Sequence, residues 1–374
     1  MRKLQNILWL GLKELRSLMS DMVMVVFVIY AFTLGIYIQA TGTSSEVNNA
    51  SIAFVDEDGS ALSKELFNAF YPPRFKAPVA IPAGHINAAM DKGVYMFVVS
   101  IPPRFEQDLR AGRNPTVQVN IDATAMQQAA IGSGYIKSIV NDRIESFLTR
   151  AEGAREKPIR LVVTRLFNPN GISSWFKSIV AIINQITLLT VVLTGAAVIR
   201  EREHGTLEHL LVMPLTPFEI AMAKVWGNGL VILVATAASL FLIVRVALKV
   251  PFAGSMPLWF AGVVLYLFFA TALGIFLGTI SRSMAQFALL IIMVILVMML
   301  LSGGSTPVES QPRWMQYFTF FLPSRQFVSF SQVIVYRGGG FDAVWRQFLM
   351  VGAVGMAFFV YSLSAFRKSI SVSK

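Results

Sequence analysis

The densest charge in the chain lies in a short segment near its middle, between two apolar stretches. This segment begins with Arg-Glu-Arg-Glu, breaks at Gly205 and is bounded by Pro214 and Pro217. Between the break and the prolines, residues 206–213 have the spacing of a short amphipathic helix with Thr206 as its N-cap. Charge this dense cannot enter lipid, so we expect a small helix lying on one membrane face. An ordinary loop with topology-setting arginines is the alternative interpretation.

No catalytic or metal-binding constellation stands out. His85 is the only histidine between residues 41 and 174, and the chain has no cysteine, so disulfides and thiolate chemistry are excluded. Asp56, Glu57 and Asp58 could bind a cation, but a charged turn between a strand and a helix is the preferred interpretation. The sequence contains no G-x-x-x-x-G-K-[S/T] phosphate loop. We therefore expect no catalytic residue, metal or cofactor in this chain; any driving ATP and magnesium would be bound by a separate polypeptide.

The composition is that of a membrane protein. Of 374 residues, 55% are hydrophobic and only 14% are charged, whereas soluble domains carry about 25% charged residues. A transmembrane helix needs about 20 consecutive apolar residues. Six apolar stretches are candidates for such helices: 22–40, 178–199, 225–244, 258–280, 286–301 and 348–366.

Charge decides the orientation. Residues 41–174 hold 14 basic and 13 acidic side chains, while the rest of the chain holds 18 and 8. The basic excess therefore flanks the spans, and its distribution favours both termini in the cytoplasm. Nucleic-acid binding is not expected. Residues 1–21 have an amphipathic pattern and predict an interfacial helix at the cytoplasmic surface, in contact with lipid.

The predicted fold is an α-helical membrane protein with six transmembrane helices and an inserted mixed α/β extracytoplasmic domain between helices 1 and 2. That domain spans 41–174, and 175–374 holds helices 2–6, with an aromatic outer re-entrant or interfacial segment at about 303–344. Within the inserted domain, alternation predicts strands at 51–55, 94–101, 115–121 and 159–167 and helices at 60–70, 104–111 and 123–152.

The predicted span interiors contain no Asp, Glu, Lys, Arg or His, which argues against a transporter driven by an ion gradient. Uncharged polar residues are present: Asn184, Thr187 and Thr194 share one face of the second span, and Asn228 belongs to the third. They line a translocation path in one interpretation; in the preferred interpretation they hold helices together, and the two are compatible.

These residues resemble a family, the permease subunits of type-2 ATP-binding-cassette exporters, in the bacterial drug-exporter-like branch with a large periplasmic domain. The resemblance runs nearly end to end. Weaker parts of it are Lys13, Glu14 and Asp21 near the N-terminus. The most specific part is E-R-E-x-G-T-x-E-x-L-L-x-x-P with a later acid and lysine, supplied by Glu201, Arg202, Glu203, Gly205, Thr206, Glu208, Leu210, Leu211, Pro214, Glu219 and Lys224.

The resemblance implies that residues 200–217 contain a coupling helix that docks on a cytoplasmic ATPase. It further implies a bacterial inner-membrane location, a second permease subunit (a copy or a paralogue) and outward movement of a drug-like or amphipathic substrate. The sequence leaves a periplasmic adaptor open. The alternative function is an ATPase-coupled mechanotransmission or sensing protein that moves no substrate across the bilayer.

Overall fold

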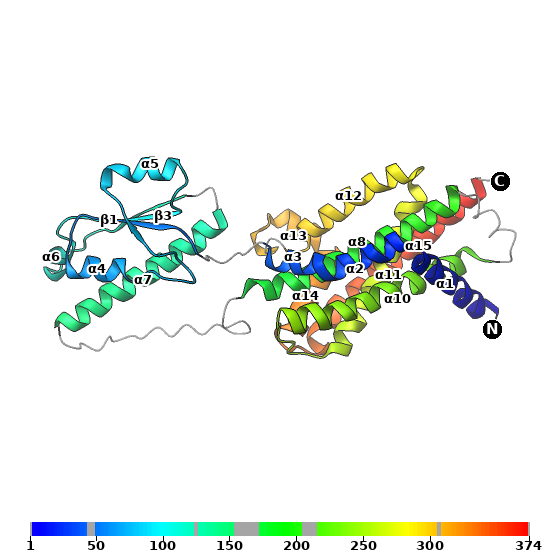
Figure 1. Cartoon of the computed structure of the whole chain (residues 1–374). Helices are drawn as coiled ribbons and strands as arrows, with labels where there is room; N and C mark the ends of the chain where they lie inside the picture. Colours follow the sequence, from blue (N-terminus) through cyan, green and yellow to red (C-terminus); the bar gives the residue numbers. More distant parts are fainter. Residues whose placement is uncertain are drawn as a thin grey trace. The chain divides into compact units, whose positions relative to one another are not determined.

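The computed structural model of the chain describes residues 2–42, 49–122, 126–152, 172–203, 215–304 and 308–372. These residues belong to two compact units (Figure 1). The first, the helical bundle, combines Met1–Gly42 with Leu166–Lys374, and the second, the sheet unit, is Thr43–Arg165. The sheet unit is therefore an insertion in the sequence of the bundle.

The described part of the bundle contains six helical segments that are long and apolar enough to cross a membrane, in agreement with the six predicted spans. Most of the molecule is helical. The six segments are Met22–Thr41, Ser173–Glu203, Pro217–Ala247, Met256–Ile280, Met284–Leu301 and Phe341–Arg367.

These segments comprise α2 (Met22–Tyr30), η1 (Ala31–Gly35), α3 (Ile36–Thr41), α8 (Ser173–Glu203), α10 (Pro217–Ser239), η4 (Leu240–Ala247), α11 (Met256–Ile280), α12 (Met284–Leu301) and α15 (Phe341–Val372). The other described elements of the bundle are α1 (Arg2–Ser20), η5 (Val308–Ser310), α13 (Arg313–Phe320) and α14 (Pro323–Val335).

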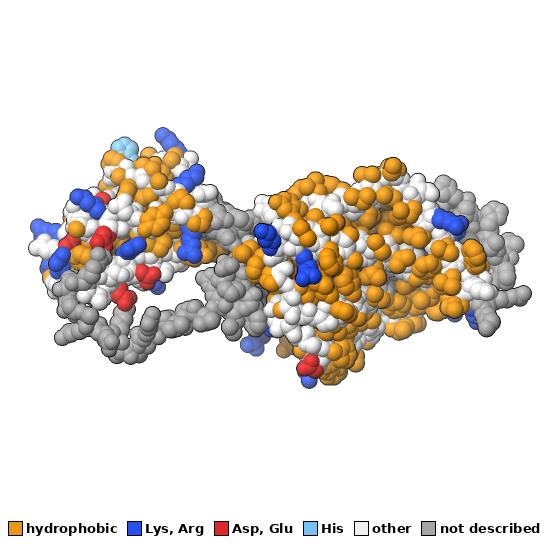
Figure 2. Space-filling model, turned by 60° about the horizontal axis from the view of Figure 1, so that its bottom comes forward, with side chains coloured by type: hydrophobic (Ala, Val, Ile, Leu, Met, Phe, Trp, Pro, Cys, Tyr) orange, Lys and Arg blue, Asp and Glu red, His pale blue; other side chains and the backbone are white. Residues whose placement is uncertain are grey.

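Two helices form the interior of the bundle. The most apolar window of α8 is 83% buried and that of α11 is 67% buried, whereas the corresponding values for the other four spans are 22–28%. The peripheral helices turn one face outward, so the visible surface of the bundle is mainly hydrophobic (Figure 2). A displacement of α8 must therefore disturb the packing of most of the core.

Small residues allow the two interior helices to approach closely. A Cβ atom on Gly274 of α11 would lie 3.0 Å from the Thr194 side chain, and one on Gly278 would lie 2.8 Å from the Gly195 carbonyl oxygen of α8. Helix pairs in membranes commonly pack through such small residues. The glycines therefore fix the position of α8 against α11.

The third span begins earlier than predicted. The apolar stretch predicts a span at 225–244, but α10 starts at Pro217. The cause is a capping box, in which the Thr216 hydroxyl accepts from the Glu219 amide and the Glu219 carboxylate accepts from the Thr216 amide. Proline fits the first turn because its missing N–H would have no partner there. As a result, Lys224 lies inside a helix and not in a loop.

The sheet unit has a four-stranded sheet in the order β2-β1-β3-β4. β1 (Ile52–Asp56) is parallel to β2 (Val79–Ala80) and to β3 (Phe97–Ile101), and β3 is antiparallel to β4 (Gln118–Ile121). β2 was not predicted, because a strand of two residues is too short to show an alternation of apolar and polar side chains. The predicted strand 159–167 lies outside the described residues.

Helices cover both faces of this sheet (Figure 1). One face packs under α4 (Ala61–Phe67), α6 (Phe105–Arg110) and the long α7 (Met126–Glu152), with Phe54 and Phe97 in the core. The smaller core on the other face includes Val98 and side chains of α5 (Ile86–Asp91), which follows η2 (Ala83–His85). Helices on both faces of a mostly parallel sheet are typical of a mixed α/β unit.

Two α-helices in the described part of the aromatic segment predicted at 303–344, α13 and α14, have different surroundings. α14 is packed into the bundle, where Phe327 and Phe330 are fully buried and the Trp259 indole donates to the Ser331 hydroxyl over 2.9 Å. In contrast, α13 exposes Trp314 and other aromatic side chains. Of these two helices, α13 has the exposed aromatic face that is typical of a membrane interface.

Candidate functional site

The candidate site lies where α8 ends and α10 begins, on either side of the charged segment. Glu201, Arg202 and Glu203 form the last described turn of α8. The other predicted coupling residues lie outside the described part of the chain: Gly205, Thr206, Glu208, Leu210, Leu211 and Pro214. The structure therefore shows how the two ends of the segment 204–214 are held.

A buried ion-pair cluster joins three helices at this place. Lys224 of α10 is 1% exposed, and its Nζ lies 2.9 Å from Glu201 Oε1 of α8 and 3.1 Å from Glu14 Oε1 of α1. Removing one partner from a buried ion pair costs about 3–5 kcal/mol, because the other charge is then left uncompensated. The cluster of Lys224, Glu201 and Glu14 therefore fixes the geometry of the three helices strongly.

Glu14 is ionised in this arrangement. Its burial alone would raise the pKa of the carboxyl group, but the Lys224 ammonium and the hydrogen bonds around it hold the pKa below its usual value. A negative Glu14 is what Lys224 needs, since a buried ammonium requires compensating charge. Glu14 therefore carries its negative charge near neutral pH.

Close packing joins α1 to α10 independently of charge. A Cβ atom on Gly11 would overlap the Trp226 indole, and one on Gly227 would lie 2.9 Å from the Gly11 carbonyl oxygen. The Trp226 indole Nε1 also donates to the Ile7 carbonyl over 2.9 Å. Two glycines thus let the helix backbones touch, as small residues do where helices cross closely.

The start of α10 makes a further contact with α1. Asn6 Nδ2 donates to Glu219 Oε1 over 3.1 Å, and the same carboxylate closes the capping box of α10 through its other oxygen. Both the first turn of α10 and its interior around Lys224 are therefore attached to the N-terminal helix.

The last turn of α8 holds the turn between α11 and α12. The Arg202 guanidinium donates to the carbonyls of Ser281, over 2.8 Å, and of Gly278 at the end of α11. Glu203 Oε1 accepts from the Met284 amide at the first residue of α12 over 3.3 Å. A cation at a helix C-terminus and an anion at an N-terminus are both favourable. The predicted coupling residues Arg202 and Glu203 thus cap neighbouring helices.

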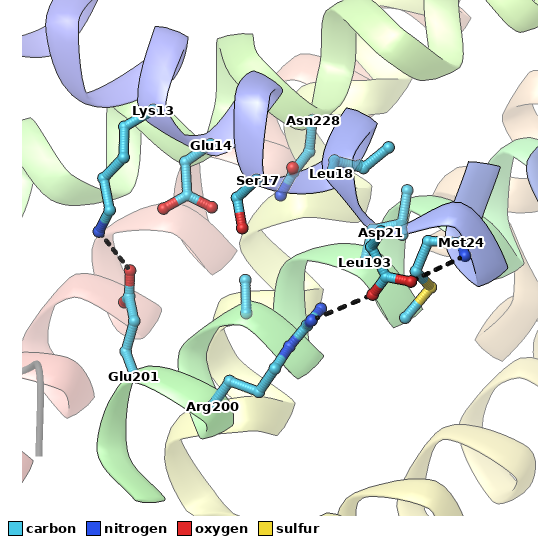
Figure 3. A pocket seen from close by; sticks show the side chains of 11 residues that line it. Lys13, Glu14, Ser17, Leu18, Asp21, Met24, Leu193, Arg200, Glu201 and Asn228 are labelled. Atoms are coloured by element: carbon cyan, nitrogen blue, oxygen red, sulfur yellow. Dashed lines mark hydrogen bonds and ion pairs between the residues drawn. The ribbon is translucent and has the colours of Figure 1, made fainter. Parts of the chain in front are cut away.

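One more charged contact joins α8 to the corner between α1 and α2. Asp21 caps α2 by accepting from the Met24 amide over 3.2 Å, and its other oxygen lies 3.5 Å from Arg200 Nη1 (Figure 3). The end of α8 is therefore connected to α1, α2, α10 and the α11–α12 turn, all through side chains of 200–203.

The predicted path residues lie between helices. Thr187 donates to the Ile183 carbonyl over 2.8 Å and is 2.7 Å from the Tyr266 hydroxyl of α11. Asn228 Nδ2 lies 3.5 Å from Thr194 Oγ1. Asn184 is buried as well. These contacts are those of polar residues that hold helices together, and the path interpretation stays a prediction.

In the sheet unit, the acidic turn has hydrogen bonds of its own. Asp56 accepts from the Asp58 and Gly59 amides, over 3.1 and 2.9 Å, as expected of a turn. Asp58 accepts from the Glu106 amide over 3.2 Å, and Glu106 accepts from the Leu62 amide over 3.1 Å, so α4 and α6 are capped reciprocally. Among the residues with described positions, no group of three or more His, Asp or Glu side chains could hold a metal ion.

Sequence reasoning did not identify Glu14 and Lys224 as a buried pair. Both residues were noted only as parts of a family pattern, because charges beside apolar stretches usually set topology. The available signal was positional: Glu14 lies on the same helical face as Gly11 and Leu18, which are buried. A carboxylate on a buried face needs a cation nearby. Lys224 can supply it, because it lies about two turns after the start signal of α10 and therefore inside that helix.

Comparison with known proteins gives consistent relatives. Residues 17–364 match the model of a family described as ABC-2 family transporter protein. The chain is 51% identical over 370 residues to the inner membrane transport permease YhhJ of Escherichia coli (strain K12), with 99% of both chains covered. It is 30% identical over 342 residues to the probable multidrug ABC transporter permease YbhR of the same strain, with 90% of this chain and 91% of that protein covered. For the probable multidrug ABC transporter permease YbhS, the identity is 27% over 339 residues.

Proposed function

Because the chain belongs to the ABC-2 family of transporter proteins, we propose that it is the membrane-spanning subunit of an ATP-driven exporter. The family makes it a transport permease of the inner membrane and implies partnership with an ABC ATPase. The proposal adds that residues 200–217 dock this ATPase, that both termini are cytoplasmic and that the sheet unit is periplasmic.

The connection of the segment 204–214 to the bundle carries this proposal. The segment is flanked by α8 and α10, and Lys224 ties both helices to α1 through Glu201 and Glu14. A force on the segment would therefore move α1, α8 and α10 as one body. Because α8 is the most buried span, its movement would reposition the core.

The surface chemistry of the segment suits a protein partner. Glu208 supplies a carboxylate for an arginine or lysine on the ATPase, and at helical spacing Leu207, Leu210 and Leu211 would share an apolar face. A second permease subunit, a copy or a paralogue, would complete the pathway. A drug-like or amphipathic substrate agrees with the name of the relative YbhR, a probable multidrug ABC transporter permease.

The test is reconstitution of the full chain in vesicles with the ATPase that co-purifies with it. We expect ATP-dependent export of a fluorescent amphiphile and stimulation of ATP hydrolysis by the permease. Stimulated hydrolysis without flux of any amphiphile would favour the mechanotransmission alternative. A rate of ATP hydrolysis that is the same with and without the permease would contradict docking of the ATPase on this chain.

A further inference from the structure

A small cavity lies beside the ion-pair cluster, between the corner of α1 and α2 and the last turns of α8 (Figure 3). Its volume is about 220 Å³. Pockets that enclose a drug-sized molecule usually measure about 300–1,000 Å³. The cavity is therefore too small for a whole amphiphile, but it can take a polar headgroup.

Two cations at the rim of this cavity are only weakly engaged. Lys13 Nζ is 4.0 Å from Glu201 Oε1, and the Lys13 side chain is 54% exposed. Arg200 Nη1 is 3.5 Å from Asp21 Oδ2, and the Arg200 side chain is 42% exposed. Ion pairs this long and this exposed contribute about 0–1 kcal/mol. Lys13 and Arg200 can therefore turn toward an anionic ligand at little cost, whereas Lys224 cannot.

Counted by residue type, the charges of the side chains around the cavity balance. Lys13 and Arg200 stand against Glu14, Asp21 and Glu201 in the lining, and Lys224 beneath it supplies the third positive charge. A net anion would disturb this balance, while a headgroup that carries one charge of each sign would preserve it. The lining thus favours a zwitterion over an anion or a cation alone.

One wall of the cavity is apolar. Leu18 and Met24, from the α1–α2 corner, and Leu193 and Ala197 of α8 line it. The outer face of α1 exposes Leu8 and Trp9, as expected of a helix at the boundary between headgroups and acyl chains. An acyl chain could therefore leave the cavity along the apolar wall into the bilayer.

From these observations we infer that the cavity binds the zwitterionic headgroup of a phospholipid that carries a primary ammonium group. The phosphate lies between Lys13 and Arg200, with the Ser17 hydroxyl as a further donor, and the ammonium lies against Asp21 and Glu14. Both the phosphate and the ammonium are held by charge-assisted hydrogen bonds, which are stronger than hydrogen bonds between neutral groups. The bound lipid joins α1 to α8 at the end of the bundle where the segment 204–214 is attached.

The inference can be tested without an ATPase, so it does not depend on the proposed function. The full-length protein is delipidated in mild detergent, offered phosphatidylethanolamine, phosphatidylcholine or phosphatidylglycerol, and analysed by native mass spectrometry. We expect the ethanolamine lipid to be retained about tenfold better than the other two. The choline ammonium has no N–H to donate to Asp21 and Glu14, and the glycerol headgroup has no positive charge; one charge-assisted hydrogen bond is worth about this factor.

Variants locate the site. Lys13→Gln and Arg200→Gln should each lower retention of the ethanolamine lipid about tenfold. Ser17→Phe, which fills the cavity from an exposed position, should do the same. Arg16→Gln is the matched control, because Arg16 is exposed on the same helix and does not line the cavity. Thermal unfolding identifies any variant that fails to fold. If Arg200→Gln fails to fold, Ser17→Phe still tests the site.

Three results would overturn the inference. Equal retention of the ethanolamine, choline and glycerol lipids would show that no built headgroup site exists. Equal loss for Arg16→Gln and Lys13→Gln would show general attraction of lipid to a basic surface. Retention unchanged by both Ser17→Phe and Arg200→Gln would place the lipid elsewhere.

Discussion

Lys224 Nζ lies 2.9 Å from Glu201 Oε1, and this ion pair joins the helix that enters the charged segment to the helix that leaves it. The lysine is buried, so its charge has to be balanced locally. Glu14 supplies the second carboxylate from a third helix. The N-terminal helix is thereby part of the frame that supports the segment.

Neutralising Lys224 should destabilise the bundle. Lys224→Met leaves Glu14 and Glu201 buried without a cation, and we expect a loss of about 3–5 kcal/mol in the free energy of unfolding. The triple variant Lys224→Met, Glu14→Gln and Glu201→Gln should recover most of that loss, since no uncompensated charge remains. Thermal unfolding in detergent measures both. A triple variant as unstable as the single one would rule out this account.

The close contact of α1 with α10 allows a matched pair of substitutions. Gly227→Ala should destabilise by about 1–3 kcal/mol, because its Cβ would lie 2.9 Å from the Gly11 carbonyl oxygen. Gly229→Ala, on the same helix, meets no atom within 4 Å and should be neutral or slightly stabilising. Chemical denaturation of both variants decides the matter. Similar losses at the two positions would show that helix flexibility, and not contact with α1, explains the effect.

Sequence reasoning identified the spans because each one carries a strong local hydropathy signal, as in 286–301. It missed the start of α10, since Thr216, Pro217 and Glu219 signal a helix only when read together as a cap. Lys224 illustrates the deeper limit. Its partner Glu14 is remote in sequence, and no local pattern in one chain shows which two charges will meet.

The coupling proposal makes its own prediction. Glu208→Lys, or deletion of residues 205–211, should abolish stimulation of the partner's ATP hydrolysis, because the carboxylate and the apolar face that meet the ATPase are lost. Membrane insertion should be unchanged, since neither change touches a span. Glu57→Lys, at an exposed turn of the sheet unit, has the same charge change and should leave stimulation intact. Full stimulation by Glu208→Lys would refute docking at this place.

The sheet unit should lose stability in acid through Glu106. Burial opposes ionisation of this carboxyl group, but the Leu62 amide and Arg110 lower its pKa below the ordinary value of 4.5. A lowered pKa in the folded state means that the contribution to stability is full above about 4.5 and is lost as the pH falls through the folded value.

Amide hydrogen exchange of the full chain reports this loss directly. Protection of α4 and α6 should fall with acidification below pH 4.5 in the native protein. In Glu106→Gln, protection should already be lower at neutral pH and should change less with acid. Glu57→Gln, whose carboxyl is exposed, serves as the control. An acid response in Glu106→Gln as large as in the native protein would assign the effect to other carboxyl groups.

The contact between Thr187 and Tyr266 separates the two interpretations of the polar residues in α8. If Thr187 holds helices together, Thr187→Val should cost about 1–3 kcal/mol, because the Tyr266 hydroxyl, 2.7 Å away and buried, loses its partner. Adding Tyr266→Phe removes the orphaned hydroxyl and should restore most of the stability. Export by the reconstituted double variant should then equal that of the native protein. A double variant that is stable but exports a different range of amphiphiles would instead place Thr187 on the translocation path.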